Sequence, residues 1–224
     1  MKAFFDKVRP MFRRGRMSSA QVDGLQKIVE QGEGMPRAHL AYVLATVFHE
    51  TGQRMQPIRE GFAKTNAGAI RAVTGLFNKG IIRTNYALPE ANGLSYYGRG
   101  LVQITWGENY KKFGIYDEPD QALLMPTALD ILFKGMIEGL FRKGNDIFMI
   151  PGKDPTLVDF IKAREIINGD TRKNGRKIAE QAVVFYNALL LVMTHEEPQE
   201  EEPHTLWCRL LDFVGLGEHS DTGD

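Results

Sequence analysis

Helical spacing of apolar residues is the dominant pattern of this chain. It predicts a first helix over about residues 19–31, where Ser18 and Gln21 have the spacing of a capping box. A second helix is predicted from Pro36 to Glu50, because proline is favoured in the first turn and Thr51-Gly52 ends the apolar periodicity. Five later segments show the same spacing, at residues 66–77, 102–113, 128–141, 156–167 and 176–193.

Glycine, asparagine and proline interrupt this pattern in two places. Residues 53–66 are expected to be irregular, and residues 78–97 to form an extended loop or a short hairpin. The predicted fold class is therefore mainly helical, with one core domain over residues 1–194 and at most a small hairpin. With 224 residues and 43% hydrophobic content, the chain is long enough to bury such a core, which excludes a disordered or fibrous protein.

Residues 195–224 differ in charge from the rest. They hold nine acidic residues and one base, a net charge of −8, whereas the other 194 residues hold 27 bases and 19 acids, a net charge of +8. An acidic linker at residues 196–203 precedes an amphipathic stretch at 206–214, whose apolar face is expected to dock on the body or on an unknown protein. The basic body indicates an anionic partner, such as nucleic acid, a membrane surface or an acidic cell-wall polymer.

Composition excludes several classes of site and segment. The single cysteine, Cys208, leaves no disulfide framework and no cysteine-based zinc site, and no second histidine lies four positions from His49, so neither a metal nor a cofactor is expected. The longest apolar run, residues 182–193, is shorter than the roughly 20 residues that cross a bilayer, so no transmembrane segment is expected. The apolar stretch at residues 3–5 is too short for a secretory signal, which predicts synthesis in the cytoplasm.

Glu50 is the first candidate for catalysis. It ends an apolar helix, where the terminal carbonyl groups and partial burial both raise the pKa of a carboxyl group. A glycosidase needs such a protonated carboxyl group to donate a proton to the leaving oxygen. Glu60, ten residues further on, is the candidate for the second carboxylate of the same cleft, and Glu90 is its alternative.

Three motifs occur in order along the chain. They are Phe48-His49-Glu50-Thr51-Gly52, Tyr96-Tyr97-Gly98-Arg99-Gly100-Leu101-Val102-Gln103-Ile104-Thr105-Trp106 and Ile166-Ile167-Asn168-Gly169. Together they resemble the glycoside hydrolases of family 19, which include the class I chitinases and many phage lysozyme-like endolysins. The resemblance runs from about residue 38 to residue 190 and implies a two-lobed, lysozyme-like fold with a central cleft.

The resemblance implies roles for individual polar residues. Glu50 falls at the general acid, and Glu60 at the carboxylate that activates the attacking water in an inverting reaction. Thr105 falls where the family has a serine or threonine that helps to hold this water. The positions that bind the hydroxyl and acetamido groups of the sugar are Gln103, Asn109 and Asn168.

Aromatic and basic residues near these positions have further expected roles. Tyr96 and Tyr97 suit stacking against sugar faces, with core packing as the alternative, whereas Trp106 is expected in the core. Arg99 is expected to pair with a catalytic-site carboxylate and to fix its position. His49 is expected to be a structural neighbour, since helical geometry turns it about 100° away from Glu50.

The chain departs from the family's pattern at three places. Gln53 replaces the second glycine of the common His-Glu-Thr-Gly-Gly string, and Asp170 follows Asn168-Gly169 where glycine is common. Residues 182–183 are Ala-Val where many members have an arginine. The missing arginine puts in question part of the network that positions the carboxylates.

The predicted function is endolysin-like hydrolysis of β-1,4 bonds in peptidoglycan, the N-acetylated glycan of the cell wall. Phage-type members of the family reach the wall, in the periplasm, after synthesis in the cytoplasm. The alternatives are a chitinase that acts on chitin oligomers and a non-catalytic wall-binding relative, although the combination of Glu50, Glu60 and Thr105 argues against the second. Nucleic acid is not an expected partner, because charge alone favours it and no recognised motif is present.

Overall fold

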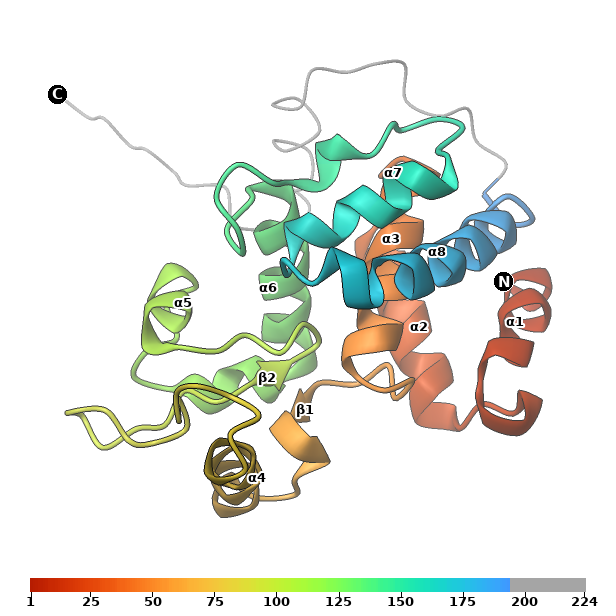
Figure 1. Cartoon of the computed structure of the whole chain (residues 1–224). Coiled ribbons are helices and arrows are strands. Elements are labelled where there is room, and N and C mark those ends of the chain that lie inside the picture. The colour runs from red at the N-terminus through yellow and green to blue at the C-terminus, as the bar shows by residue number, and fades with distance from the viewer. Residues whose placement is uncertain (194–224) are drawn as a thin grey trace, which may run out of the picture.

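Two groups of helices make up the protein (Figure 1). The computed structural model describes residues 1–193, and the predicted acidic linker and amphipathic stretch lie outside the described residues. The first group is built on two helices that pack against each other, α3 (Arg37–Glu50) and α8 (Arg176–Leu189). Around them lie α1 (Lys2–Val8), α2 (Ser19–Gln31) and α7 (Leu157–Lys162).

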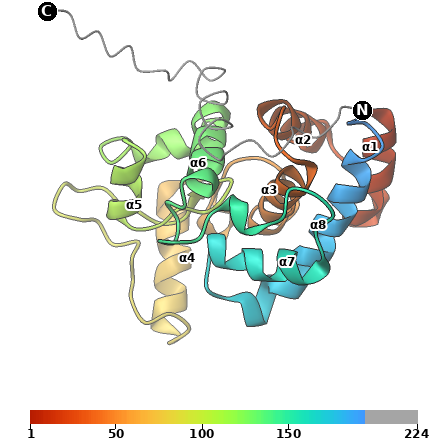
Figure 2. The same cartoon turned by 90° about the horizontal axis from the view of Figure 1, so that it is seen from above.

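The second group contains a small sheet and shorter helices. Its elements are β1 (Ile58–Arg59), α4 (Asn66–Asn78), β2 (Arg99–Gly100) and α5 (Gly107–Lys112). In two perpendicular views, α6 (Met125–Ile137) lies between the two groups (Figures 1 and 2). Single helical turns occur at Arg9–Met11, Arg13–Gly15, Glu60–Phe62, Pro119–Leu123, Ile147–Met149, Ala163–Ile166 and Thr171–Gly175.

One main core joins the two groups. It includes Leu44 of α3 and Phe185 of α8 together with Tyr110 of α5 and Leu132 of α6, all fully buried. A smaller apolar cluster lies under α4 and contains Ala69, Val73, Ala87 and Tyr97. Because both groups contribute to the main core, they are packed as one body rather than as separate domains.

Helix α3 is buried along most of its length. Every residue from Ala38 to Phe48 is buried, as expected for a segment that is apolar or small on all sides. Its last residue, Glu50, is therefore carried to the edge of the interior, where a side chain leaves the core but remains largely shielded from water.

The two short strands place Glu60 beside the second motif. β1 pairs antiparallel with β2, with Ile58 opposite Gly100 and Arg59 opposite Arg99. The backbone contact continues past the strands, because Glu60 N donates to Gly98 O over 2.7 Å. A Cβ on Gly61, whose φ is +63°, would lie 2.7 Å from the Cβ of Ala72, so this turn needs glycine.

The predicted helices are largely confirmed, with corrections to their bounds. The helix expected over 156–167 is α-helical only over Leu157–Lys162 and continues as a 3-10 turn, and the helix expected over 176–193 ends at Leu189. The helix expected over 102–113 begins only at Gly107, because residues 101–106 form a turn in which Gln103 and Trp106 have positive φ angles. The segment at 128–141 is helical from Met125 but ends at Ile137, followed by Gly139 at φ +64°. Helix α1 was not predicted at all. Among residues 1–193, no helix combines the length and the apolar character needed to cross a membrane.

Candidate active site

Glu50, at the end of α3, makes an ion pair with a buried arginine. Arg164 Nη1 donates to Glu50 Oε1 over 2.7 Å, and the side chains are 2% and 16% exposed. Burial raises the pKa of Glu50, and the nearby charge of Asp170 raises it further, while Arg164 opposes both effects. The net direction is upward, so Glu50 keeps its proton to a higher pH than an ordinary glutamate does, as a general acid requires.

Asp170 holds the other edge of the same guanidinium. Arg164 Nε donates to Asp170 Oδ1 over 2.5 Å, and Asn174 donates to the second oxygen of Asp170. Partial burial acts against ionisation, but these hydrogen bonds hold the pKa of Asp170 below its usual value. Asp170 therefore anchors Arg164.

Arg164 is a buried cation beside Glu50 that was not among the predicted site residues. Sequence analysis missed this residue, because a charged side chain in an amphipathic helix is usually at the surface. Its spacing could have indicated burial, because residues four positions apart lie on the same face of a helix and Phe160 is apolar. In the structure both side chains are buried.

Glu60 is fixed by two hydrogen bonds from the second group of elements. The Tyr86 hydroxyl donates to Oε1, and the backbone amide of Gly98 donates to Oε2 over 2.7 Å. Two donors, one to each oxygen, hold the carboxyl group in one orientation. A Cβ on Gly98 would lie 3.0 Å from Gln103 Oε1 and 3.1 Å from Glu60 Oε2, so glycine lets these two oxygens approach the same stretch of backbone.

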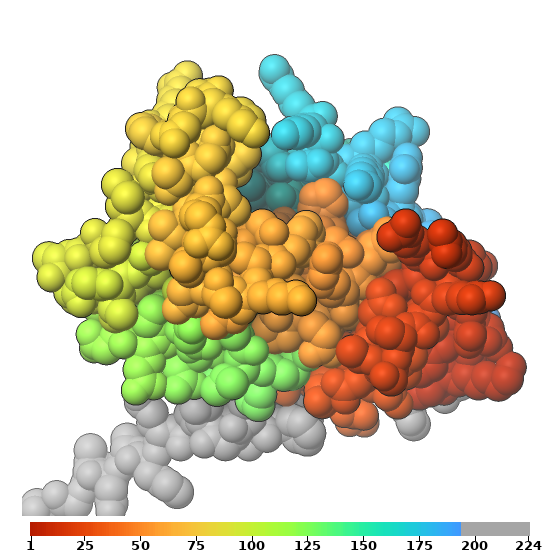
Figure 3. All heavy atoms as spheres, turned by 90° about the horizontal axis from the view of Figure 1, so that it is seen from below, coloured from red at the N-terminus to blue at the C-terminus, as the bar shows by residue number. Residues whose placement is uncertain are grey.

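Both carboxylates line one cavity of about 460 Å³. The surface is hollowed between the segment around residues 65–90, in yellow, and the segment around residues 160–175, in cyan (Figure 3). The other residues around the cavity are Tyr86, Gly98, Val102, Gln103, Ile104, Thr105, Asn109, Phe141, Ile167 and Asn168. The cavity therefore joins residues from all three sequence motifs.

Four of the predicted polar residues lie at this cavity with Glu50 and Glu60. Thr105 and Asn109 are tied together, because Asn109 Nδ2 donates to Thr105 O over 2.7 Å. Gln103 Nε2 donates to Ile58 O over 3.0 Å and to Gly100 O over 3.1 Å, which fixes its amide group over β1 and β2. Asn168 is exposed on the opposite wall.

The prediction that Tyr96 and Tyr97 stack on sugars is wrong, because both rings are buried. Tyr96 stacks on Tyr116 with ring centroids 4.8 Å apart and donates its hydroxyl to Tyr116 O. Tyr97 donates to Asn66 Oδ1 over 2.6 Å. The two tyrosines pack in the interior at the start of the second motif and do not line the cavity.

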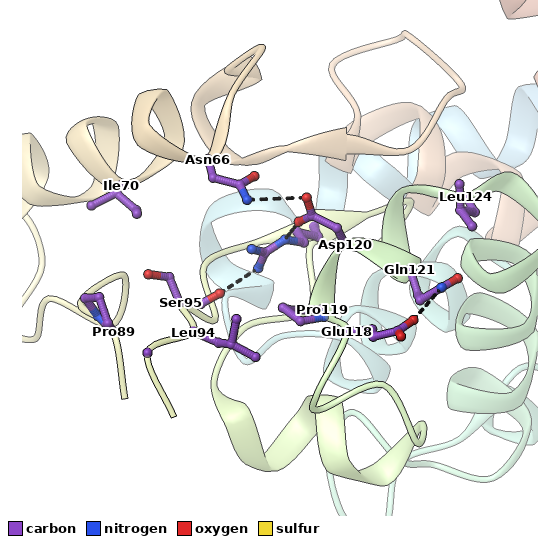
Figure 4. Close-up of a pocket in the computed structure, with 12 residues that line it drawn as sticks. Asn66, Ile70, Pro89, Leu94, Ser95, Glu118, Pro119, Asp120, Gln121 and Leu124 are labelled. Atoms are coloured by element: carbon purple, nitrogen blue, oxygen red, sulfur yellow. Dashed lines mark hydrogen bonds and ion pairs between the residues drawn. The ribbon is translucent and has the colours of Figure 1, made fainter. Parts of the chain in front are cut away.

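Arg99 does not pair with a catalytic-site carboxylate, and this prediction is also wrong. The side chain is 2% exposed, and its Nε donates over 2.7 Å to Asp120, which also pairs with Arg59. Arg99 faces a second cavity of about 640 Å³, at which Asp120 accepts a hydrogen bond from Asn66 (Figure 4). Gly98 and Arg99 are neighbours in the second motif, but they line different cavities.

Trp106, which is exposed, and Tyr86, which is partly buried, are paired aromatic residues beside the cavity. Trp106 was expected in the core, but it is 46% exposed, and its ring lies 5.4 Å from that of Tyr86. Its position follows from its backbone, because the positive φ of 69° turns the chain just before α5. Tyr86 lines the cavity and lies in the long loop after α4, where no periodicity distinguished it.

Neither His49 nor Glu90 is among the residues that line the cavity with Glu50 and Glu60. Burial, together with the charges of Arg164 and Lys177, lowers the pKa of His49 to about 4, so it is neutral at pH 7. Glu90 is exposed, accepts a hydrogen bond from the Tyr116 hydroxyl over 2.9 Å and is absent from the lining of the 460 Å³ cavity. Gln53 has a positive φ of 70°, a backbone conformation that favours glycine.

No group of three or more histidine, cysteine, aspartate or glutamate side chains within residues 1–193 has an arrangement that would hold a metal ion. No family model, curated protein or solved structure matches this chain.

Proposed function

We propose that this protein is an endolysin-like glycoside hydrolase that cleaves β-1,4 bonds of peptidoglycan with two carboxylates. The observation that carries the proposal is the cavity of about 460 Å³, which brings Glu50 and Glu60 together with Gln103, Thr105, Asn109 and Asn168. The order of the three motifs and their resemblance to family 19 support the same reading.

The two carboxylates differ in environment in the way that acid–base catalysis needs. Glu50 is largely buried and has a raised pKa, which suits a proton donor. Glu60 is held in one orientation by hydrogen bonds from Tyr86 and Gly98, which suits a group that must position a water molecule.

The reaction follows from these environments. Glu50 donates its proton to the glycosidic oxygen as the bond to the anomeric carbon breaks. Glu60 takes a proton from a water molecule, held with the help of the Thr105 hydroxyl, and this water attacks the opposite face of the sugar. The product then has the inverted configuration at its anomeric carbon.

The remaining lining residues suit an N-acetylated sugar. The amide groups of Gln103, Asn109 and Asn168 can bind hydroxyl and acetamido groups, and Tyr86 with Trp106 offers an aromatic face beside the cavity. Peptidoglycan is the favoured glycan because of the basic body and the resemblance to phage-type enzymes, which act on the wall after release from the cytoplasm. Chitin oligomers are the alternative substrate.

The test is incubation with purified peptidoglycan and, separately, with chitin oligomers, followed by mass analysis of the products. Cleavage of peptidoglycan by the wild-type chain, absent with Glu50→Gln, is the expected result, and the sugar at the new reducing end identifies the bond. Cleavage of chitin oligomers but not of peptidoglycan would identify chitin, the alternative, as the substrate. Binding to peptidoglycan without any product would favour the non-catalytic wall-binding alternative.

A further inference from the structure

The cavity itself is rich in acidic groups, which raises the question of how it would accept an anionic glycan. Glu50 and Glu60 line it, and Asp170 lies behind Glu50. The cation among them, Arg164, is 2% exposed and already bound to Glu50 and Asp170. No lysine or arginine is among the residues that line the cavity, so a cation that binds an anionic substrate must lie at its rim.

Arg142 lies at this rim. It follows Phe141, which lines the cavity, and its guanidinium lies against the Asn168-Gly169 turn of the opposite wall. A Cβ on Gly169 would come within 3.0 Å of Arg142 Nη1, so the glycine is what lets the guanidinium lie there. The Arg142 side chain is 39% exposed, in contrast to the buried Arg164.

A fixed ion pair orients Arg142. Its Nη1 donates to Glu165 Oε2, and the other oxygen of Glu165 accepts a hydrogen bond from the Thr171 hydroxyl over 2.5 Å. The guanidinium has five N–H donors, and Glu165 engages one edge of it. The group is thus held in place while further donors remain for a planar anion.

Lys112 lies on the other side of Phe141. It is on α5, three residues after Asn109, so it shares the face of the helix that carries a residue lining the cavity. Its Nζ donates to Leu140 O over 2.8 Å, which places the exposed ammonium group beside the residue that precedes Phe141. Neither Lys112 nor Arg142 is among the lining residues, but both lie next to Phe141, which is, so they lie just outside the cavity beside this residue.

From this juxtaposition we propose that Lys112 and Arg142 form a subsite for a carboxylate carried by the glycan, and that this subsite selects anionic peptidoglycan over neutral chitin. The inference rests on the proposed function, because it concerns the substrate of the same cavity. A carboxylate can come from the stem peptide or from the lactyl group of a peptide-free strand. Both present the planar anion that a guanidinium binds.

The experiment compares three soluble glycans of similar length. They are strands that keep their stem peptides, the same strands stripped of peptides, and chitin oligomers without carboxylates. Values of kcat/KM are measured for wild type, Arg142→Gln, Lys112→Gln and the double variant, and affinities are measured in the Glu50→Gln background. The matched controls are Lys111→Gln, on the same helix but paired with Glu108, and Arg176→Gln, which removes an exposed ion pair with Glu180.

The expected result is a loss of at least about tenfold in kcat/KM, through KM, on one of the carboxylate-bearing glycans for the double variant, with chitin changed by less than about twofold. The glycan that is affected identifies the source of the carboxylate. Arg142→Lys should retain part of the selectivity, and the difference should shrink as salt shortens the Debye length to about 8 Å near 0.15 M.

Two outcomes would overturn the subsite. Equal losses on all three glycans would mean that Arg142 shapes the Asn168-Gly169 turn, and unchanged kinetics would mean that the two cations do not contact substrate. Failure of the proposed function is separate. If no glycan is cleaved but affinity for the anionic strands still depends on Lys112 and Arg142, the hydrolase proposal fails and the subsite stands.

Discussion

Arg164 Nη1 donates to Glu50 Oε1 over 2.7 Å, although 114 positions separate the two residues in the chain. The pair is shielded from water, and Asp170 binds the opposite edge of the guanidinium. Glu50 therefore experiences two opposed charges in addition to its burial. Its pKa, and with it the pH range of a reaction that needs its proton, is set by the balance among these three effects.

Substitutions of Arg164 and Asp170 should shift the pH dependence of kcat in opposite directions. Arg164→Gln removes the cation that favours the ionised form of Glu50, so the pKa of Glu50 should rise and the alkaline limb should move to higher pH. Asp170→Asn removes a neighbouring negative charge, so the alkaline limb should move down. Full pH–rate profiles check both, and shifts of the same sign would contradict the arrangement.

Arg164→Gln should also lower the stability of the fold. It leaves Glu50 and Asp170 without their shared buried partner, and such a loss typically costs about 3–5 kcal/mol of unfolding free energy. Denaturant unfolding measures this cost. Arg176→Gln is the control, because its ion pair with Glu180 is exposed and should contribute little.

Glu50→Gln should keep the fold and lower turnover by at least about 10²-fold, since the amide has the same shape but no proton to donate. The amide oxygen can still accept the hydrogen bond from Arg164. Glu108→Gln is the matched control, because Glu108 is exposed on α5. Turnover by Glu50→Gln within about threefold of wild type on the true substrate would remove Glu50 from the mechanism.

Glu60→Gln and Glu90→Gln should separate the two candidates for the second carboxylate. Glu60 lines the cavity with Glu50, whereas Glu90 is bound to Tyr116 away from it. We expect a severe loss of turnover for Glu60→Gln and a small effect for Glu90→Gln. A larger loss of turnover for Glu90→Gln than for Glu60→Gln would identify Glu90 as the base. The loop that carries Glu90 would then have to approach Glu50.

The product should have the α configuration at its new anomeric carbon when it is first formed. A base that activates water on the face opposite the leaving group inverts the β bond, whereas a covalent glycosyl intermediate would retain it. Proton NMR of fresh product, before mutarotation, distinguishes the two. A β product would make Glu60 a nucleophile rather than a base.

The sequence was informative where a long periodic segment carries the chemistry. Helix α3 has a cap region at Pro36, a continuous apolar body and a stop at Thr51-Gly52, so the location of Glu50 at its buried end could be predicted. Helix α1 could not, because its seven residues contain only Phe4, Phe5 and Val8 as large apolar positions, too few to establish a period.

The aromatic residues could not be assigned from sequence for a different reason. β2 has two residues, so no alternation along it could show which side chains face the core, and Tyr96 and Tyr97 are buried by tertiary packing. Tyr86 reaches the cavity from a loop without helix or strand, and its partner Glu60 lies 26 residues away. Contacts of this kind depend on how the loop closes, which local pattern does not encode.

His49→Gln should make stability less sensitive to acid. The pKa of His49 is about 4 in the folded protein, because of burial and the charges of Arg164 and Lys177, against 6.5 as its ordinary value. Between these values the unfolded chain binds more protons at this position than the folded chain, so the unfolding free energy falls as pH falls from about 6.5 towards 4. Glutamine does not titrate and removes this contribution.

The measurement is the difference in unfolding free energy between His49→Gln and wild type, followed from pH 7 to pH 4.5. Burial also lowers the pKa of His39, and burial raises that of Glu50, but these groups are present in both proteins and largely cancel in the difference. The unfolding free energy of the variant, relative to that of wild type, should rise steadily as the pH falls. Parallel curves over this range would mean that His49 has the same pKa in the folded and unfolded protein, so that neither burial nor the charges of Arg164 and Lys177 shift it.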